Sequence, residues 1–240
     1  MIESVNNERI KEITKLHDKK YRKLYNKFLA VGKHLVEEAI KKDIALELFL
    51  LDGTINNYGM EATYVSENVM KKLADQTSIP KEVCVCKIVK CNEVIGNVIM
   101  LDDIKDPGNL GTIIRSAVAF NYETIILSKE CVDIYNQKVI RSSEGMLFNI
   151  NIIIDDLEKY IYILKDKNYK IYSTDVVTGV SPKKENDKHV LIIGSEAKGV
   201  SENIKSLADQ NLKLDMNPLC ESLNAGVSAS ILMYELGGER

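Results

Sequence analysis

Short apolar runs alternate with helical patterns from about residue 98 onward, and this alternation limits the possible folds more than any other feature of the chain. Runs such as 98–101 and 190–193 are continuous and rich in branched apolar residues, as strands buried on both faces are. The stretch 156–167 between them spaces its apolar residues as a helix does. Strands that alternate with helices build a mostly parallel sheet covered on both faces. The sequence therefore predicts an α/β fold for this part of the chain.

The first ninety residues predict a smaller α/β unit. Its expected elements are helices at 7–28 (with a polar interruption at 19–23), 31–40 and 66–74, and strands at 45–51, 62–65 and 83–89. The pattern becomes polar between 91 and 97, so we divide the chain into an N-terminal domain, 1–94, and a larger domain, 95–240. In the larger domain we expect strands at 98–101, 124–127, 150–154, 170–173, 190–193 and 212–214, and helices at 109–119, 134–141, 156–167, from 201 onward and at 222–236.

Composition places the chain among globular proteins without a membrane segment. Of its 240 residues, 45% are hydrophobic and 28% are charged, and no apolar run approaches membrane-spanning length. The N-terminus has neither the basic segment nor the apolar core of a signal peptide, so we expect a cytoplasmic protein. The five cysteines have no zinc-site spacing, so we expect buried free thiols and no metal: Cys84, Cys86, Cys91, Cys131 and Cys220.

Charge is distributed unevenly along the chain. The net charge of -3 argues against a nucleic-acid partner, but residues 1–42 hold eleven Lys or Arg against six Asp or Glu. This end is therefore basic on an acidic protein, which suits a surface that faces phosphates. A solvated, lysine-rich helix pair explains the same pattern equally well. The candidate nucleic-acid contacts in this region are Lys19, Lys20, Arg22 and Lys23.

The first of three polar loops lies at 106–115 and reads Asp-Pro-Gly-Asn-Leu-Gly-Thr-Ile-Ile-Arg. Its Pro-Gly pair predicts a turn, and Asn109 is a good N-cap for the helix that follows. Arg115 comes about a turn and a half later, where a guanidinium near a helix N-terminus suits a phosphate or another polar oxygen. Many helices begin in this way, so the loop alone is weak evidence of function.

The second loop, 194–201, follows an apolar strand and reads Gly-Ser-Glu-Ala-Lys-Gly-Val-Ser. It is not a phosphate-binding P-loop, because its lysine precedes the glycine, and it lacks the dinucleotide-binding glycine pattern. A glycine at the carboxyl edge of a sheet still allows a ligand to approach the backbone. Glu196 places a carboxylate there, although an exposed glutamate in a loop is usually a solvated charge.

The third loop, 221–228, reads Glu-Ser-Leu-Asn-Ala-Gly-Val-Ser and opens the last helix. Ser222 is explained most simply as the N-cap of that helix. Asn224, within the first turn, has an amide that both donates and accepts hydrogen bonds beyond the helix end.

Together the three loops resemble the motifs of the SpoU (TrmH) family of RNA ribose 2'-O-methyltransferases, in the SPOUT superfamily. The matching segments are 109–115, 192–201, and Met216 followed by 221–230. They share order, spacing and strand–loop–helix context over about residues 96–236. The N-terminal unit resembles, more loosely, the L30e-like substrate-binding domain that many members carry.

The resemblance implies transfer of a methyl group from S-adenosylmethionine to a ribose 2'-hydroxyl, with 23S ribosomal RNA the favoured substrate. It places Arg115 near the target hydroxyl, with Glu196, Ser222 and Asn224 completing the site. Asn109 would hold the loops or contact the substrate. A guanidinium keeps its proton beyond pH 12, so Arg115 is better suited to position phosphate and ribose oxygens than to act as the base. Which group accepts the hydroxyl proton stays open.

The resemblance also implies a trefoil-knotted C-terminal domain that binds the cofactor largely through backbone groups, and a homodimer. The residues that it assigns to the cofactor are Gly194, Gly199, Leu214, Met216 and Leu223. Arg115 would serve either its own site or that of the partner subunit. Arg141, at the end of a helix near a polar turn, is either an RNA contact or a surface charge.

Other functions fit parts of the sequence. A tRNA 2'-O-methyltransferase would carry the same motifs. A non-catalytic RNA-binding ribosome-assembly factor would keep the fold but would not need polar residues in all three loops. An enzyme acting on nucleotide phosphates is disfavoured, because the phosphate-binding order of lysine and serine or threonine is missing.

Overall fold

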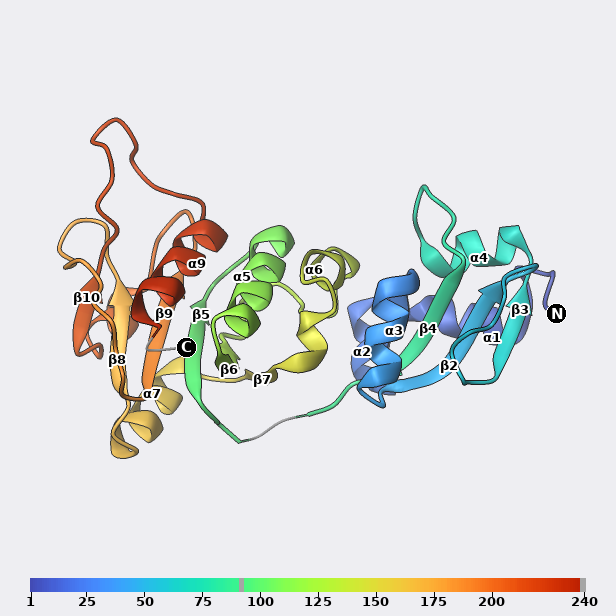
Figure 1. Cartoon of the computed structure of the whole chain (residues 1–240), viewed down its shortest axis with the longest axis horizontal. Helices are drawn as coiled ribbons and strands as arrows, with labels where there is room; N and C mark the ends of the chain where they lie inside the picture. Colours follow the sequence, from blue (N-terminus) through green and yellow to red (C-terminus); the bar gives the residue numbers. More distant parts are fainter. Residues whose placement is uncertain (91–92, 238–240) are drawn as a thin grey trace. The chain divides into compact units, whose positions relative to one another are not determined.

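The computed structural model describes residues 1–90 and 93–237, which form two compact units (Figure 1). The first unit combines Met1–Val89 with Tyr135–Phe148, and the second combines Lys90–Ile134 with Asn149–Arg240. The chain thus passes from one unit to the other just before the predicted boundary between 94 and 95. Tyr135–Phe148, which we had placed in the larger domain, belongs with the first unit.

The first unit is built on a four-stranded mixed sheet in the order β1-β4-β2-β3. Strand β4 is antiparallel to both β1 and β2, and β2 is parallel to β3. The strands are β1 (Lys27–Val31), β2 (Ala45–Leu51), β3 (Ala62–Val65) and β4 (Glu82–Lys87). The helices are α1 (Glu8–Thr14), η1 (Lys15–His17), α2 (Lys19–Tyr25), α3 (Lys33–Lys41), α4 (Glu67–Ala74), α6 (Gln137–Ser142) and all but the last residue of η2 (Met146–Asn149).

The structure corrects our prediction for residues 19–31. The predicted polar interruption is helix α2, whose N-terminus is capped by Asp18 and whose C-terminus ends at Asn26 in the left-handed conformation. The residues that follow form strand β1 rather than the end of one helix and the start of another. Four of its five residues are buried, so the strand shows no alternation of apolar and polar residues. A short, continuous apolar run of this kind does not distinguish a strand from a helix.

The second unit contains a six-stranded sheet that is parallel throughout, in the order β10-β8-β9-β5-β6-β7. Its strands are β5 (Asn97–Asp102), β6 (Tyr122–Leu127), β7 (Asn151–Ile154), β8 (Lys170–Thr174), β9 (His189–Gly194) and β10 (Gln210–Leu212). Strands β5, β6 and β7 lie side by side in chain order. Strands β8, β9 and β10 lie on the other side of β5, with β9 next to β5. Ligands of such sheets bind outside the carboxyl ends of the strands where the order reverses, which here are β5 and β9.

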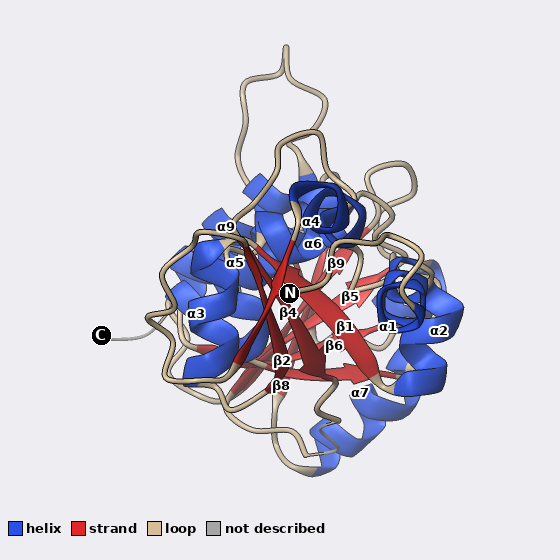
Figure 2. Ribbon diagram, turned by 90° about the vertical axis from the view of Figure 1, so that its right-hand side faces the viewer, coloured by secondary structure: helices blue, strands red, loops and turns tan. Residues whose placement is uncertain are grey.

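Helices cover both faces of this sheet, as predicted (Figure 2). They are α5 (Pro107–Ala119), α7 (Leu157–Asp166), α8 (Glu202–Lys205) and α9 (Ala225–Leu236). Helix α7 packs Ile161 and Leu164 against strand residues such as Met100 and Ile192. Helices α5 and α9 lie on the opposite side and pack on each other. Strands of parallel sheets are buried on both faces, which explains why apolar runs located them in the sequence.

Three further observations concern membrane spans, metal ligands and cysteines. No helix among the described residues combines the length and apolarity that crossing a membrane requires. Within the same residues, no three His, Cys, Asp or Glu side chains gather in a way that would hold a metal ion. Three predicted thiols are free and buried: Cys84, Cys86 and Cys131. Cys220 is exposed, which corrects the prediction, and Cys91 lies outside the described residues.

A buried histidine should make stability depend on pH. His189 is fully buried at the start of β9, where its Nε2 lies 2.8 Å from the hydroxyl of Tyr122. Desolvation lowers the pKa of His189 below its ordinary value of 6.5. The unfolded chain therefore binds a proton more readily than the folded chain, and the free energy of unfolding should fall as the pH drops below about 6.5.

Thermal unfolding followed by circular dichroism tests this prediction. We expect a lower Tm at about pH 5 than at about pH 7.5, and a smaller difference in His189→Gln. His17, whose pKa burial also lowers, should account for part of the dependence that is left. An unchanged pH dependence in His189→Gln would contradict the assignment.

Candidate functional site

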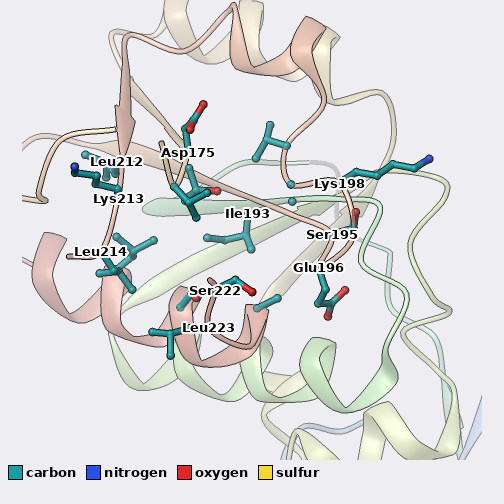
Figure 3. Close-up of a pocket in the computed structure, with 18 of the residues that line it drawn as sticks. Asp175, Ile193, Ser195, Glu196, Lys198, Leu212, Lys213, Leu214, Ser222 and Leu223 are labelled. Atoms are coloured by element: carbon teal, nitrogen blue, oxygen red, sulfur yellow. The ribbon is translucent and has the colours of Figure 1, made fainter. Parts of the chain in front are cut away.

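A cavity of about 470 Å³ lies at the carboxyl ends of β8 and β9 (Figure 3). It includes the end of β9 but not that of β5, so it lies one strand away from the position that the strand order predicts. All five residues that the resemblance assigns to the cofactor line it: Gly194, Gly199, Leu214, Met216 and Leu223. Further lining comes from apolar side chains, including Ile193, Leu212 and Leu232. This mixture of apolar side chains and glycine backbone suits a small organic ligand.

Loop 194–201 forms one wall of the cavity and is folded tightly on itself. A Cβ atom at Gly194 would lie 2.0 Å from the carbonyl carbon of Gly199 and 2.1 Å from the nitrogen of Val200. The Gly199 N–H donates to the carbonyl of Ser195 at 2.8 Å. At the far end of the loop, the Asp102 carboxylate accepts hydrogen bonds from the backbone N–H and hydroxyl of Ser201, at 2.9 and 2.7 Å. These contacts fix the shape of the wall.

Side chains from the three polar loops form one hydrogen-bonded network beside this wall. The Asn109 Nδ2 donates to the Glu196 carboxylate. The Asn224 Nδ2 donates to the Asn109 Oδ1 at 2.8 Å. The Asn224 Oδ1 in turn accepts the N–H groups of Gly226 and Val227, at 3.0 and 3.2 Å. The three loops therefore meet at one place, as the family resemblance implies, although their chemical roles stay predictions.

The structure reassigns both helix caps that we predicted. Asp106 caps α5 by accepting the N–H of Asn109 at 2.8 Å, so Asn109 lies in the first turn with its amide available to the network. The N-cap of α9 is Asn224 rather than Ser222. Ser222 lies in the preceding loop, lines the cavity and points into it in Figure 3.

Arg115 is not part of this arrangement. It is exposed on α5 and, among the described residues, has no hydrogen-bond or ion-pair partner. It follows Asn109 by six residues, so it leaves the helix on a different face, roughly 9 Å further along the axis. It does not contribute to the cavity wall of its own chain.

The candidate RNA contacts of the first unit divide into two groups. Lys19, Lys20 and Lys23 are exposed and form no ion pair with the described part of the chain. Arg22 is 6% exposed, and its guanidinium donates to the carbonyls of Leu16 and His17, at 2.8 and 2.7 Å. Our prediction that Arg22 contacts RNA is therefore wrong, because Arg22 joins η1 to α2.

Arg141 lies on α6 and lines an open, polar groove in the first unit, together with Lys71 and Lys72. This position is compatible with its predicted contact to RNA, which stays a prediction.

Sequence reasoning gave no role to four charged residues of the cavity wall: Asp175, Lys198, Lys205 and Lys213. Asp175 follows β8 directly, and its carboxylate accepts the N–H groups of Val177 and Thr178, at 2.8 and 3.1 Å. These hydrogen bonds hold the pKa of Asp175 well below its usual range. Lys205 lies 3.1 Å from the same carboxylate. The signal was present, because Asp175 follows a strand at the carboxyl edge of the sheet, as Glu196 does.

Comparisons with known proteins agree with this geometry. A family model described as the SpoU rRNA Methylase family matches residues 96–234. A second model, the MRM3-like substrate binding domain, matches residues 7–84. The 23S rRNA (guanosine(2553)-2'-O)-methyltransferase RlmP of Bacillus subtilis (strain 168) is 34% identical over 246 residues, which cover 99% of each chain.

Solved structures share the fold over almost the whole chain. A crystal structure of an RNA 2'-O ribose methyltransferase is 26% identical, with a TM-score of 0.82, and the match covers 98% of this chain and 96% of that one. An rRNA methyltransferase from Sinorhizobium meliloti, solved with AdoMet bound, is similar in fold at 24% identity and a TM-score of 0.87, covering 98% and 95%. The predicted two-domain α/β architecture is thereby confirmed. With the family model over its C-terminal part and a relative matched end to end, the chain belongs to the SpoU rRNA methylase family.

Proposed function

We propose that this protein transfers a methyl group from S-adenosylmethionine to a ribose 2'-hydroxyl of 23S ribosomal RNA. The observation that carries the proposal is the network of Asn109, Glu196 and Asn224 beside the cavity. The name of the Bacillus subtilis relative, which matches over both full lengths, supports the substrate. Because the substrate is ribosomal RNA, we place the reaction in the cytoplasm.

The cavity fits the cofactor in size and chemistry. Its volume of about 470 Å³ falls in the usual range for small-molecule sites. The apolar residues Leu214 and Leu223 would suit the faces of an adenine ring, and the tight loop at Gly194 and Gly199 would offer backbone groups for its polar edge. The cofactor supplies an electrophilic methyl group on its sulfonium, so the protein has mainly to align the acceptor oxygen.

The network supplies a carboxylate held in one orientation. Asn224 is fixed by capping α9, its amide orients Asn109, and Asn109 in turn holds one oxygen of Glu196. Glu196 is the ionisable member of these three residues. We assign its second oxygen to the ribose hydroxyl, as the group that orients the nucleophile and receives its proton. Ser222, which points into the same cavity, completes the polar set.

Arg115 is assigned to the phosphates that flank the target ribose, in the site of a partner subunit. Its exposure on α5, away from its own cavity, supports this assignment. Helix α9, which packs on α5, exposes an apolar stripe formed by Val227, Ile231 and Tyr234. Such a stripe suits burial against a second copy of the chain. The homodimer is thus part of the proposal, and the knot expected from the resemblance stays a prediction.

The exposed lysines of α2 should contribute salt-dependent RNA affinity. The variant Lys19→Glu/Lys20→Glu/Lys23→Glu should bind RNA about tenfold more weakly, or worse, at moderate salt, with a shallower salt dependence. S-adenosylmethionine affinity should not change, because none of the three lines the cavity. Filter binding and calorimetry measure the two affinities.

The matched control carries the same charge change in the second unit: Lys167→Glu/Lys183→Glu/Lys184→Glu. Its RNA affinity should fall much less than that of the α2 variant. Equal losses in the two variants would mean that net charge, rather than a surface on α2, sets the affinity.

Mapping ribose methylation in a strain that lacks the protein tests the proposed substrate. Loss of one 2'-O-methyl group from 23S ribosomal RNA supports the proposal. Loss from a tRNA would reassign the substrate. Unchanged methylation together with a ribosome-assembly defect would favour the non-catalytic alternative.

A further inference from the structure

A corner of the first unit combines an aromatic ring with unpaired cations. Tyr21 and Tyr25 lie one turn apart on α2 with their rings stacked, 5.9 Å between centroids. The Nζ atoms of Lys15 and Lys20 lie 5.7 and 5.8 Å from the Tyr21 ring centroid. Both lysines are exposed and, within the described residues, have no acidic partner. We call Lys15, Lys20, Tyr21 and Tyr25 the Tyr21 corner.

Core packing and buried hydrogen bonds fix the Tyr21 corner in place. Tyr25 packs against the core of the first unit and so supports the ring of Tyr21. The buried guanidinium of Arg22 ties the carbonyls of Leu16 and His17 to α2, which fixes η1, and with it Lys15, relative to Tyr21. The ring is therefore presented on a rigid element rather than on a loose loop.

The chemistry of the corner fits an unpaired RNA base better than a duplex. A base stacks on an aromatic face whatever its identity, whereas the bases of an RNA duplex are already stacked inside the helix. The two exposed cation–π contacts are weak and exchangeable. When a base covers the Tyr21 ring, both ammonium groups are free to pair with the phosphates on either side of that base. An acidic protein surface would satisfy the lysines but would leave the ring without a partner.

We propose that the Tyr21 corner binds single-stranded RNA. An unpaired base stacks on Tyr21, and Lys15 and Lys20 bind the phosphates on either side of that base. The inference rests on the proposed function in that it names the form of RNA which the first unit recognises. It differs from the phosphate contacts of the α2 lysines, because stacking discriminates between unpaired and paired bases, whereas phosphate contacts do not.

Fluorescence anisotropy with the full chain tests the proposal, using an oligoadenylate of about 16 nucleotides and the same strand annealed to its complement. Tyr21→Ala should bind the single strand about 5- to 100-fold more weakly and the duplex as the unaltered protein does. The slope of affinity against salt should not change, because no charge is removed. Tyr21→Phe keeps the stacking face and should bind both probes normally. Tyr162→Ala removes an exposed tyrosine of the second unit and serves as the matched control.

Each other result overturns the inference. Equal losses for single strand and duplex in Tyr21→Ala would mean that the residue supports the fold of the corner. Unchanged affinity for both would mean that the ring takes no part. If Tyr21→Ala lowers the Tm, Tyr21→Phe and Tyr21→Leu are compared at one temperature, since leucine fills space without offering a stacking face. The inference then requires that Tyr21→Leu lose affinity for the single strand and that Tyr21→Phe keep it. The proposed methyl transfer is measured separately, by cofactor binding and ribose methylation, so either idea can fail alone.

Discussion

Gly194→Ala is expected to abolish binding of S-adenosylmethionine. The added methyl group would lie 2.0 to 2.1 Å from backbone atoms of Gly199 and Val200. Backbone cannot move aside as the end of a side chain can, so loop 194–201 would have to open and the cavity wall would be lost. We expect the affinity to fall by at least about 100-fold, measured by calorimetry.

RNA binding by the first unit shows whether the effect of Gly194→Ala is local or extends to the whole protein. RNA binding by the first unit should persist in Gly194→Ala, because no residue of loop 194–201 belongs to that unit. Gly237→Ala is the control: a Cβ there would meet the backbone oxygens of Met233 and Tyr234 at 3.3 Å, which is tight but more than 1 Å longer than the contacts at Gly194. If Gly194→Ala bound the cofactor normally, the cavity at the carboxyl ends of β8 and β9 would not be the cofactor site.

Arg115→Ala should keep the cofactor and lose turnover. Because Arg115 does not line the cavity, S-adenosylmethionine affinity should stay within about threefold. The rate of ribose methylation should fall by about 100-fold or more, the usual effect of removing a group that holds charge at a reacting centre. Arg115→Lys should recover part of the rate, because lysine keeps the charge but not the two-pronged contact with phosphate.

Mixing inactive variants tests which subunit uses Arg115. In a mixed dimer of Arg115→Ala and Glu196→Ala, one site would combine an intact Glu196 with an intact Arg115 from the partner. Random exchange of subunits should then restore roughly a quarter of the activity. An inactive mixture with confirmed subunit exchange would assign Arg115 to its own site, and normal turnover by Arg115→Ala would remove it from the mechanism.

Much of the second unit was predictable because its strands are buried on both faces. Val98, Ile125 and Leu191 lie in continuous apolar runs that have few alternatives to a parallel sheet. The meeting of the three loops was implied by the family resemblance, and the topology explains it, since parallel strands present their carboxyl ends at one edge. The family resemblance added the chemical assignment, which topology alone does not supply.

The failures have local physical causes. Residues 27–31 are too short and too uniformly apolar to show a period. Asp106 and Asn109 are both good capping residues. Proline prefers the first helical position, so Pro107 was the signal that identifies Asp106 as the N-cap. The burial of Arg22 depends on two carbonyls at the junction of η1 and α2, and no charge count in a sequence locates such carbonyls.

Nucleoside mass spectrometry tests the central claim most directly. Ribosomal RNA from a strain that lacks the protein would be incubated with the purified protein and isotopically labelled S-adenosylmethionine, then digested to nucleosides. We predict the label on a ribose 2'-oxygen, and none when Glu196→Ala replaces the unaltered protein. Label on a base, or no label although the cofactor binds, would contradict the claim that these three loops form a ribose methylation site.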